Sequence, residues 1–135
     1  MNQLIELFNK GYYDISKRFQ RIEIEEFLLL YNYKKIIVEE NGKVFGFALY
    51  FTLTDKTLSM IKDRKIDITK PEGVNLCFKE KGSNLHIFLV VADGAKTILK
   101  GLRGIISSKN FKTISWFSPD MNDFFIRRIL CHQLL

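Results

Sequence analysis

The chain has 135 residues, a formal net charge of +6 and a pI of about 9.3. Apolar residues make up 47 % of the chain and charged residues 27 %, which is an ordinary globular balance. No run approaches the roughly 18 apolar residues that a membrane-spanning helix needs. Glu6, Asn9 and Lys10 interrupt the apolar start, where a signal peptide would lie. We therefore expect a single cytoplasmic domain over residues 1–135 that has no membrane partner.

The positive net charge permits contact with a nucleic acid or another polyanion but does not by itself indicate such a partner. The basic residues form no sustained run and are dispersed among fifteen acids, so a nucleic-acid partner is not favoured. Cys77 and Cys131 have no paired metal-ligand spacing and no CxxC motif. Their pattern predicts free, buried thiols and no metal site.

A hairpin is the strongest local signal in the first half of the chain. Two short helices are expected before it, one ending near Gly11 and one running from Ser16 or Glu23 to Tyr31. Two strands then follow, at residues 35–40 and 43–53. Between them Asn41-Gly42 is a two-residue turn that requires positive φ, and Gly46 inside the second strand predicts a bulge or a close backbone approach.

Two short helices are predicted after the hairpin. Thr54 or Asp55 caps the first, which runs to about Asp63. The second begins over residues 69–72, where a proline occupies the first turn. It is expected to end at Lys81, with Gly82 as its left-handed cap.

A strand, a helix and a second strand follow, over residues 85–117. Residues 85–91 form an apolar run typical of a buried strand, residues 95–106 carry an apolar stripe at helical spacing, and residues 112–117 form the second strand. Strands joined by such a helix are expected to be parallel, with a right-handed crossover. Residues 124–131 fit a last strand or a short helix, and a strand is preferred. The predicted fold class is a mixed α/β (α+β) sheet: an antiparallel hairpin, then helices, then a parallel β-α-β unit.

The turn at Asp93-Gly94 leaves a helix N-terminus whose backbone N–H groups are a natural place for a phosphate or another anion. Lys96, Lys100 and Arg103 fall on one side of this helix. They fit either a solvated helix face or a track for phosphate or nucleic acid. Trp116 and Phe117 on the second strand either pack in the core, which is favoured, or wall a pantetheine-like or base-stacking pocket.

The run over residues 39–50, EENGKVFGFALY, resembles the hairpin of the second and third strands in the GNAT superfamily of N-acetyltransferases. Residues 85–108 resemble the fourth strand of that family and the helix that follows it. The resemblance spans residues 23–119. It implies a GNAT-like domain in which the fourth and fifth strands splay apart and hold the pantetheine arm of acetyl-CoA or another acyl-CoA. A small, phage-type member with reduced catalysis fits the compact chain.

Carried over position by position, the phosphate loop of the family falls on residues 91–96. Gly94 matches the pattern, whereas Val91, Asp93 and Lys96 depart from it. The cofactor-binding residues that the resemblance implies are Val90, Val91, Gly94, Ala95, Lys96 and Thr97. The family often places a tyrosine acid after the fifth strand, where this chain has Phe124 and Phe125.

His86 at the start of the residue 85–91 strand is the candidate general base. The alternative is a strand-end histidine at the surface or capped by backbone. We expect a protein that transfers an acyl group from acyl-CoA to an unidentified amine. A non-catalytic GNAT-like structural or binding protein and a basic nucleic-acid-binding domain remain alternatives.

Overall fold

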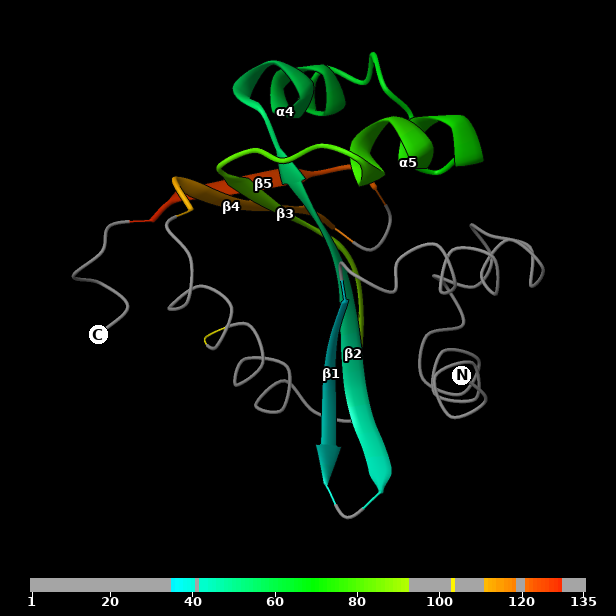
Figure 1. Cartoon of the computed structure of the whole chain (residues 1–135). Helices are drawn as coiled ribbons and strands as arrows, with labels where there is room; N and C mark the ends of the chain where they lie inside the picture. The colour runs from blue at the N-terminus through cyan, green and yellow to red at the C-terminus, as the bar shows by residue number, and fades with distance from the viewer. Residues whose placement is uncertain (1–34, 41, 93–102, 104–110, 119–120, 130–135) are drawn as a thin grey trace.

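The computed structural model describes residues 35–40, 42–92, 103, 111–118 and 121–129. Within them lies one five-stranded mixed sheet in the order β1-β2-β3-β4-β5, and two helices lie together on one side of β3, β4 and β5 (Figure 1). The elements are β1 (Lys35–Glu40), β2 (Lys43–Leu53), α4 (Asp55–Lys62), α5 (Pro71–Phe78), β3 (Asn84–Ala92), β4 (Thr113–Phe117) and β5 (Phe124–Arg128). The predicted fold class is confirmed.

Two groups of predicted helices lie outside the described residues. They are the helices expected before residue 35 and the helix expected between β3 and β4, of which Arg103 alone is described; it is helical and exposed. In the described part of the chain no helix is both long and apolar enough to cross a membrane.

The predicted hairpin is confirmed with its predicted bounds. β1 and β2 pair antiparallel, and Gly42 in the turn has a φ of 78°, which glycine adopts without steric cost. The pairing moves from Val38 opposite Gly46 to Glu39 opposite Val44, so one extra residue lies on β2. The bulge predicted at Gly46 is therefore present next to that residue.

Both helices between β2 and β3 are confirmed at their starts. Thr54 is the N-cap of α4, and its hydroxyl accepts a hydrogen bond from the Thr57 N–H at 3.3 Å. Pro71 is the first residue of α5. The thiol of Cys77 is free and buried, as expected, and burial raises its pKa to about 12. Cys131 lies outside the described residues.

The predicted end of the second helix is wrong. α5 ends at Phe78 instead of Lys81, and Gly82 is not a left-handed cap, because Gly42 is the only glycine of the described residues with positive φ. Gly82 meets a different need. Its N–H donates to the Thr52 carbonyl at 3.0 Å, and a Cβ placed on it would lie 2.0 Å from the Leu53 carbonyl oxygen. Close backbone approach to the end of β2 explains this glycine.

The sheet has buried side chains on both faces. One apolar cluster contains Ala48, Tyr50, Leu85, Ile87 and Phe111, against which Ile114, Trp116 and Ile129 pack. Because strand side chains alternate, Phe51 and His86 point to the opposite face, the one that α4 and α5 cover. Burial of the Tyr50 ring raises the pKa of its hydroxyl.

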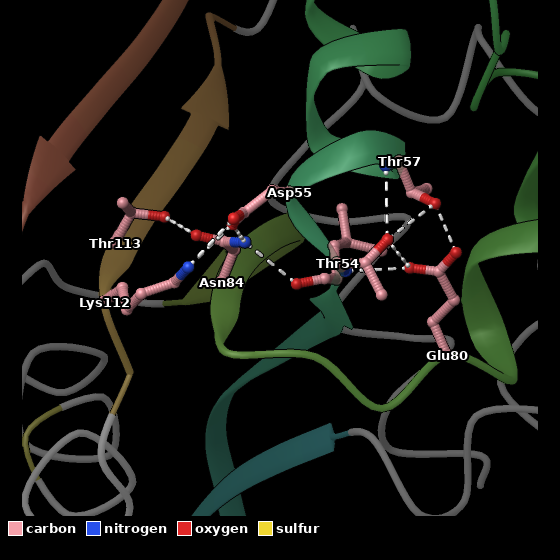
Figure 2. A network of polar contacts seen from close by, with 8 residues as sticks. Thr54, Asp55, Thr57, Glu80, Asn84, Lys112 and Thr113 are labelled. Atoms are coloured by element: carbon pink, nitrogen blue, oxygen red, sulfur yellow. Dashed lines mark hydrogen bonds and ion pairs between the residues drawn. The ribbon is translucent and has the colours of Figure 1, made fainter.

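A polar network joins the amino ends of β3 and β4 to the start of α4 (Figure 2). The buried Asn84 amide donates to the Leu53 carbonyl at 3.0 Å and to Asp55 at 2.8 Å, and its oxygen accepts from the Thr113 hydroxyl at 2.8 Å. The Lys112 ammonium lies 2.9 Å from the Asp55 carboxylate. These hydrogen bonds to Asn84 and Lys112 hold the pKa of Asp55 below its usual value.

Glu80 extends the network toward α5. Its carboxylate accepts hydrogen bonds from the Thr54 N–H at 2.9 Å, from the Thr54 hydroxyl at 3.1 Å and from the Thr57 hydroxyl (Figure 2). Its backbone carbonyl accepts from the Thr52 hydroxyl at 3.0 Å. The polar groups near the buried end of β2 thus have partners, as buried polar groups require.

Candidate functional site

β3 and β4 separate partway along their length. They are parallel, as predicted, and pair from Asn84 opposite Thr113 to Ile87 opposite Trp116. Beyond that position β3 runs on to Ala92 beside β2, while β4 ends at Phe117. The expected splayed strands are therefore present, and the opening lies at the carboxyl ends of both strands, where open sheets commonly bind ligands.

A bulge in β3 lies where the opening begins. Tyr50 of β2 is opposite Ile87, whereas Leu49 is opposite Leu89, so Phe88 is an extra residue on β3. A bulge of this kind bends the strand and increases its twist. The bend thus starts one residue after the last pair with β4, which accounts for the divergence of the two strands.

The opening offers backbone hydrogen-bonding groups to a ligand. From Leu89 to Ala92, β3 pairs with β2, and no other described strand lies along its second edge. Alternate residues of a strand direct their N–H and C=O groups to that edge. An extended chain containing amide groups fits such an edge, because it can add its own donors and acceptors to the sheet. The pantetheine arm of coenzyme A has this chemistry.

The structure describes two of the six predicted cofactor-binding residues. Val90 and Val91 lie in β3 opposite Ala48 and Phe47, within the part that β4 does not pair. Gly94, Ala95, Lys96 and Thr97 lie outside the described residues. The structure therefore places the first two beside the opening, and the phosphate loop stays a prediction.

His86 lies in the core, so the alternative of a strand-end histidine at the surface or capped by backbone is wrong. The side chain is 0 % exposed, and its Nδ1 lies 2.8 Å from the Ser115 hydroxyl oxygen on β4. The rings of Phe51 and Phe124 lie nearly parallel to the imidazole, with centroids at 6.2 and 6.0 Å. Side chains of the neighbouring strands enclose the ring on this face of the sheet, because β3 pairs with both β2 and β4 at this position.

Burial lowers the pKa of His86 to about 3, so the imidazole is neutral at physiological pH. Its Nε2 is buried and has no hydrogen-bond partner. A general-base role for His86 stays a prediction, and it requires the ring to become accessible to an amine. Sequence reasoning missed the Ser115 partner because 29 positions separate the two residues.

Trp116 and Phe117 pack among other apolar side chains, which agrees with the core alternative, and the ligand-pocket alternative stays a prediction. Trp116 is half-buried, packs against the apolar cluster and stacks on Phe125 with a centroid distance of 5.6 Å. Phe117 contacts the His86 ring and lines a pocket beneath α4. The last strand, residues 124–128, confirms the preferred interpretation, although it ends at Arg128 and residues 130–131 lie outside the described residues.

No protein-family model and no curated protein matches the sequence. Two solved structures do resemble this one. The loading GNATL domain of CurA from Lyngbya majuscula has a TM-score of 0.60 and 15 % identity, over 87 % of this chain and 59 % of that one. The GphF GNAT-like decarboxylase in complex with isobutyryl-CoA has a TM-score of 0.60 and 10 % identity, over 85 % of this chain and 59 % of that one. This chain thus matches about three-fifths of either neighbour's length, and its fold is GNAT-like.

Proposed function

We propose that this protein uses acyl-CoA, which binds in the opening between β3 and β4. The observation that carries the proposal is the end of the β3–β4 pairing at Ile87 and Trp116, while β3 continues to Ala92. A ligand arm with amide groups fits the edge left there. The structural neighbour in complex with isobutyryl-CoA supports the same ligand class.

In this proposal the pantetheine arm lies between residues 87–91 and residues 115–118. Val90 and Val91 bind the arm through their backbone. The pyrophosphate lies near Gly94, Ala95, Lys96 and Thr97, where the sequence predicts a helix N-terminus and the Lys96 ammonium would favour negative charge. Acetyl-CoA and branched acyl-CoA are the first ligands to test.

The proposed reaction is transfer of the acyl group to an amine. The amine nitrogen forms a bond to the thioester carbonyl carbon, the C–S bond breaks, and the proton from nitrogen ends on the sulfur of coenzyme A. The protein contributes positioning of the two reactants. A backbone N–H at the opening polarises the carbonyl.

The second candidate is a non-catalytic acyl-CoA-binding protein. One observation favours it: Phe124 lies where the GNAT superfamily often places a tyrosine acid, and its ring stacks on His86 in the core. A phenylalanine supplies no proton to a leaving thiolate. Binding without turnover is the result that distinguishes this candidate.

The test is a titration of the purified protein with coenzyme A, acetyl-CoA and isobutyryl-CoA, followed by calorimetry and by tryptophan fluorescence. Trp116 is the only tryptophan of the chain and lies at the last β3–β4 pair, so its emission reports on the opening. We expect saturable binding with a change in emission. Each titration is repeated at two salt concentrations, because a nucleic-acid-binding protein would instead bind DNA or RNA with a steep loss of affinity as salt rises.

The variant Gly94→Glu adds a negative charge where the pyrophosphate is proposed to lie, and we expect it to weaken binding. Asn75→Glu is the matched control, since Asn75 is exposed on α5 and the variant adds the same charge. Equal affinity of both variants would remove the proposed phosphate site. An absence of heat and of any thermal shift at millimolar ligand would remove acyl-CoA use altogether.

A further inference from the structure

A pocket of about 200 Å³ lies between the end of α4, the segment that joins α4 to α5, and the end of β4. The lining residues that matter here are Ile61, Arg64, Asp67, Ile68, Phe117 and Met121. Its volume is below the roughly 300–1,000 Å³ of pockets that hold drug-sized ligands. It therefore suits a small molecule and is too small for coenzyme A.

The pocket lies at the end of β4. Phe117 lines it and directly follows Trp116, the last residue of β4 that pairs with β3. Its lining is mixed: the apolar part comes from residues such as Ile61, Ile68, Phe117 and Met121, and the polar part from Arg64, Asp67 and Thr69. A small apolar group bound here would contact Phe117, the residue that follows the last β3–β4 pair.

Arg64 is held in place at the rim of this pocket. One guanidinium nitrogen donates to the Met121 carbonyl and, at 3.3 Å, to the Asn122 carbonyl, while the guanidinium carbon lies 4.6 Å from the centre of the Phe117 ring. Arg64 and Met121 are also the only non-glycine residues of the described chain with positive φ, at 64° and 65°. Two residues in this uncommon conformation thus meet at one pocket.

The guanidinium keeps donors for a ligand. Arginine has five N–H donors, and the hydrogen bonds to Met121 and Asn122 use one of its terminal nitrogens. Among the described residues no carboxylate forms an ion pair with Arg64. A planar carboxylate is the group that matches the remaining donors best.

Asp67 supplies the opposite charge at the same rim. One oxygen of its carboxylate accepts from the Thr69 N–H at 2.9 Å and from the Thr69 hydroxyl at 2.5 Å. These hydrogen bonds lower the pKa of Asp67, so the group is ionised at neutral pH. No hydrogen bond within the described residues occupies the other oxygen, which is available to an ammonium group.

We propose that this pocket binds an apolar α-amino acid. Arg64 receives the carboxylate, Asp67 receives the amino group, and the side chain packs against Ile61, Ile68 and Phe117. The role of this amino acid rests on the proposed function: it is the amine that receives the acyl group from the thioester in the opening. Arg64 and Asp67 carry opposite charges three residues apart and complement the two charges of the zwitterion. The apolar residues of the pocket lining complement its side chain.

The experiment compares three probes of one carbon skeleton by calorimetry: L-leucine, 3-methylbutylamine, which lacks the carboxylate, and 4-methylpentanoate, which lacks the amine. Each is titrated with and without saturating coenzyme A. We expect leucine to bind at least tenfold more tightly than either analogue. Equal binding of leucine and one analogue would overturn recognition of the zwitterion.

Two variants assign the charges. Arg64→Asn, which keeps a residue that tolerates positive φ, is expected to weaken leucine and 4-methylpentanoate about tenfold and to leave 3-methylbutylamine unchanged. Asp67→Asn is expected to weaken 3-methylbutylamine about tenfold and to leave 4-methylpentanoate unchanged. Lys65→Asn and Asp63→Asn are matched controls, since both are exposed neighbours outside the pocket lining. Thermal melts establish that all four variants are folded.

The outcomes separate this inference from the proposed function. If acyl-CoA binds and none of the three probes does, the amino-acid pocket is wrong and acyl-CoA use stands. If leucine binds and acyl-CoA does not, the pocket stands and its role as the acceptor site is wrong. If leucine competes with longer acyl chains for the pocket, the acyl chain is the occupant and the inference is overturned.

Discussion

Ile87 and Trp116 lie opposite each other in the sheet, and they are the last residues that β3 and β4 pair. The extra residue Phe88 follows immediately on β3. The bulge in β3 therefore lies directly after the last residue that pairs with β4. This relationship makes the cause of the opening testable.

Deletion of Phe88 removes the bulge and leaves the remaining β2–β3 pairs, such as Leu49 with Leu89, in register. We expect the strand to straighten and acyl-CoA binding to be lost, as measured by calorimetry and Trp116 emission. Phe88→Ala is the control: it removes the ring that lies 5.1 Å from the Phe51 ring but keeps the bulge, and it should bind. Loss of binding in Phe88→Ala and retention in the deletion would contradict this account.

The buried pair of His86 and Ser115 predicts an acid-sensitive fold. The pKa of His86 is about 3 in the folded state and 6.5 in the unfolded state. Between these pH values the unfolded state binds a proton at His86 and the folded state does not. The contribution of the neutral His86 to the free energy of unfolding is therefore complete above pH 6.5. It is lost as the pH falls toward 3, at up to about 1.4 kcal/mol per pH unit. The double variant His86→Phe with Ser115→Ala should show a flatter dependence of the unfolding free energy over this range.

The single variant Ser115→Ala gives the matched comparison for that pair. It leaves Nδ1 of His86 buried without its partner, in addition to the unpartnered Nε2, and should cost about 1–3 kcal/mol at pH 7. Chemical denaturation at pH 7 and pH 5 measures both variants. A double variant as acid-sensitive as the parent would show that other groups control the response.

Asn84 should matter far more to stability than the ion pair beside it. Asn84→Ala removes the partners of the Leu53 carbonyl and the Thr113 hydroxyl and should cost about 2–3 kcal/mol. Lys112→Gln removes the contact with Asp55, whose side chain is 75 % exposed, and should cost much less than Asn84→Ala, because solvent screens an exposed ion pair. Urea denaturation of the two variants checks the order, and similar losses would be evidence against it.

Gly82 and Gly42 are predicted to respond in opposite ways to substitution. Gly82→Ala places a Cβ against the backbone of Leu53 and should destabilise by on the order of 3 kcal/mol, or prevent folding. Gly42→Asn should be tolerated within about 1 kcal/mol, because nothing lies within 4 Å of its Cβ position and Asn accepts positive φ. A tolerated Gly82→Ala, seen as an unchanged melting temperature, would show that the backbone can shift there.

Much of the fold followed from local sequence signals. Asn41-Gly42 located the hairpin because a two-residue turn of that kind admits few conformations. The parallel arrangement of β3 and β4 followed from the length of the segment between them, since parallel strands need a long connection. Thr54 and Pro71 marked two helix starts for equally local reasons.

The site was less accessible because its contacts are distant in the sequence. The bulge at Phe88 lies inside an unbroken apolar run, where nothing distinguishes an extra residue from a paired one. Arg64 reaches Met121 across 57 positions. Gly82 was misassigned because glycine after a helix fits both a left-handed cap and a close approach, and the second depends on Leu53 in another strand.

The hydrogen bonds of Asn84 have a consequence for motion of the sheet. They fasten the amino ends of β3 and β4 to each other and to α4, whereas the same two strands are separate beyond Ile87 and Trp116. Because β3 and β4 are joined at their amino ends, they can move apart at their carboxyl ends through a change in the angle between them. The paired residues keep their hydrogen-bond partners in this motion. Ligand entry and release would thus leave the strand register intact, and amide hydrogen exchange would stay slow at Leu85 while it changes at Leu89.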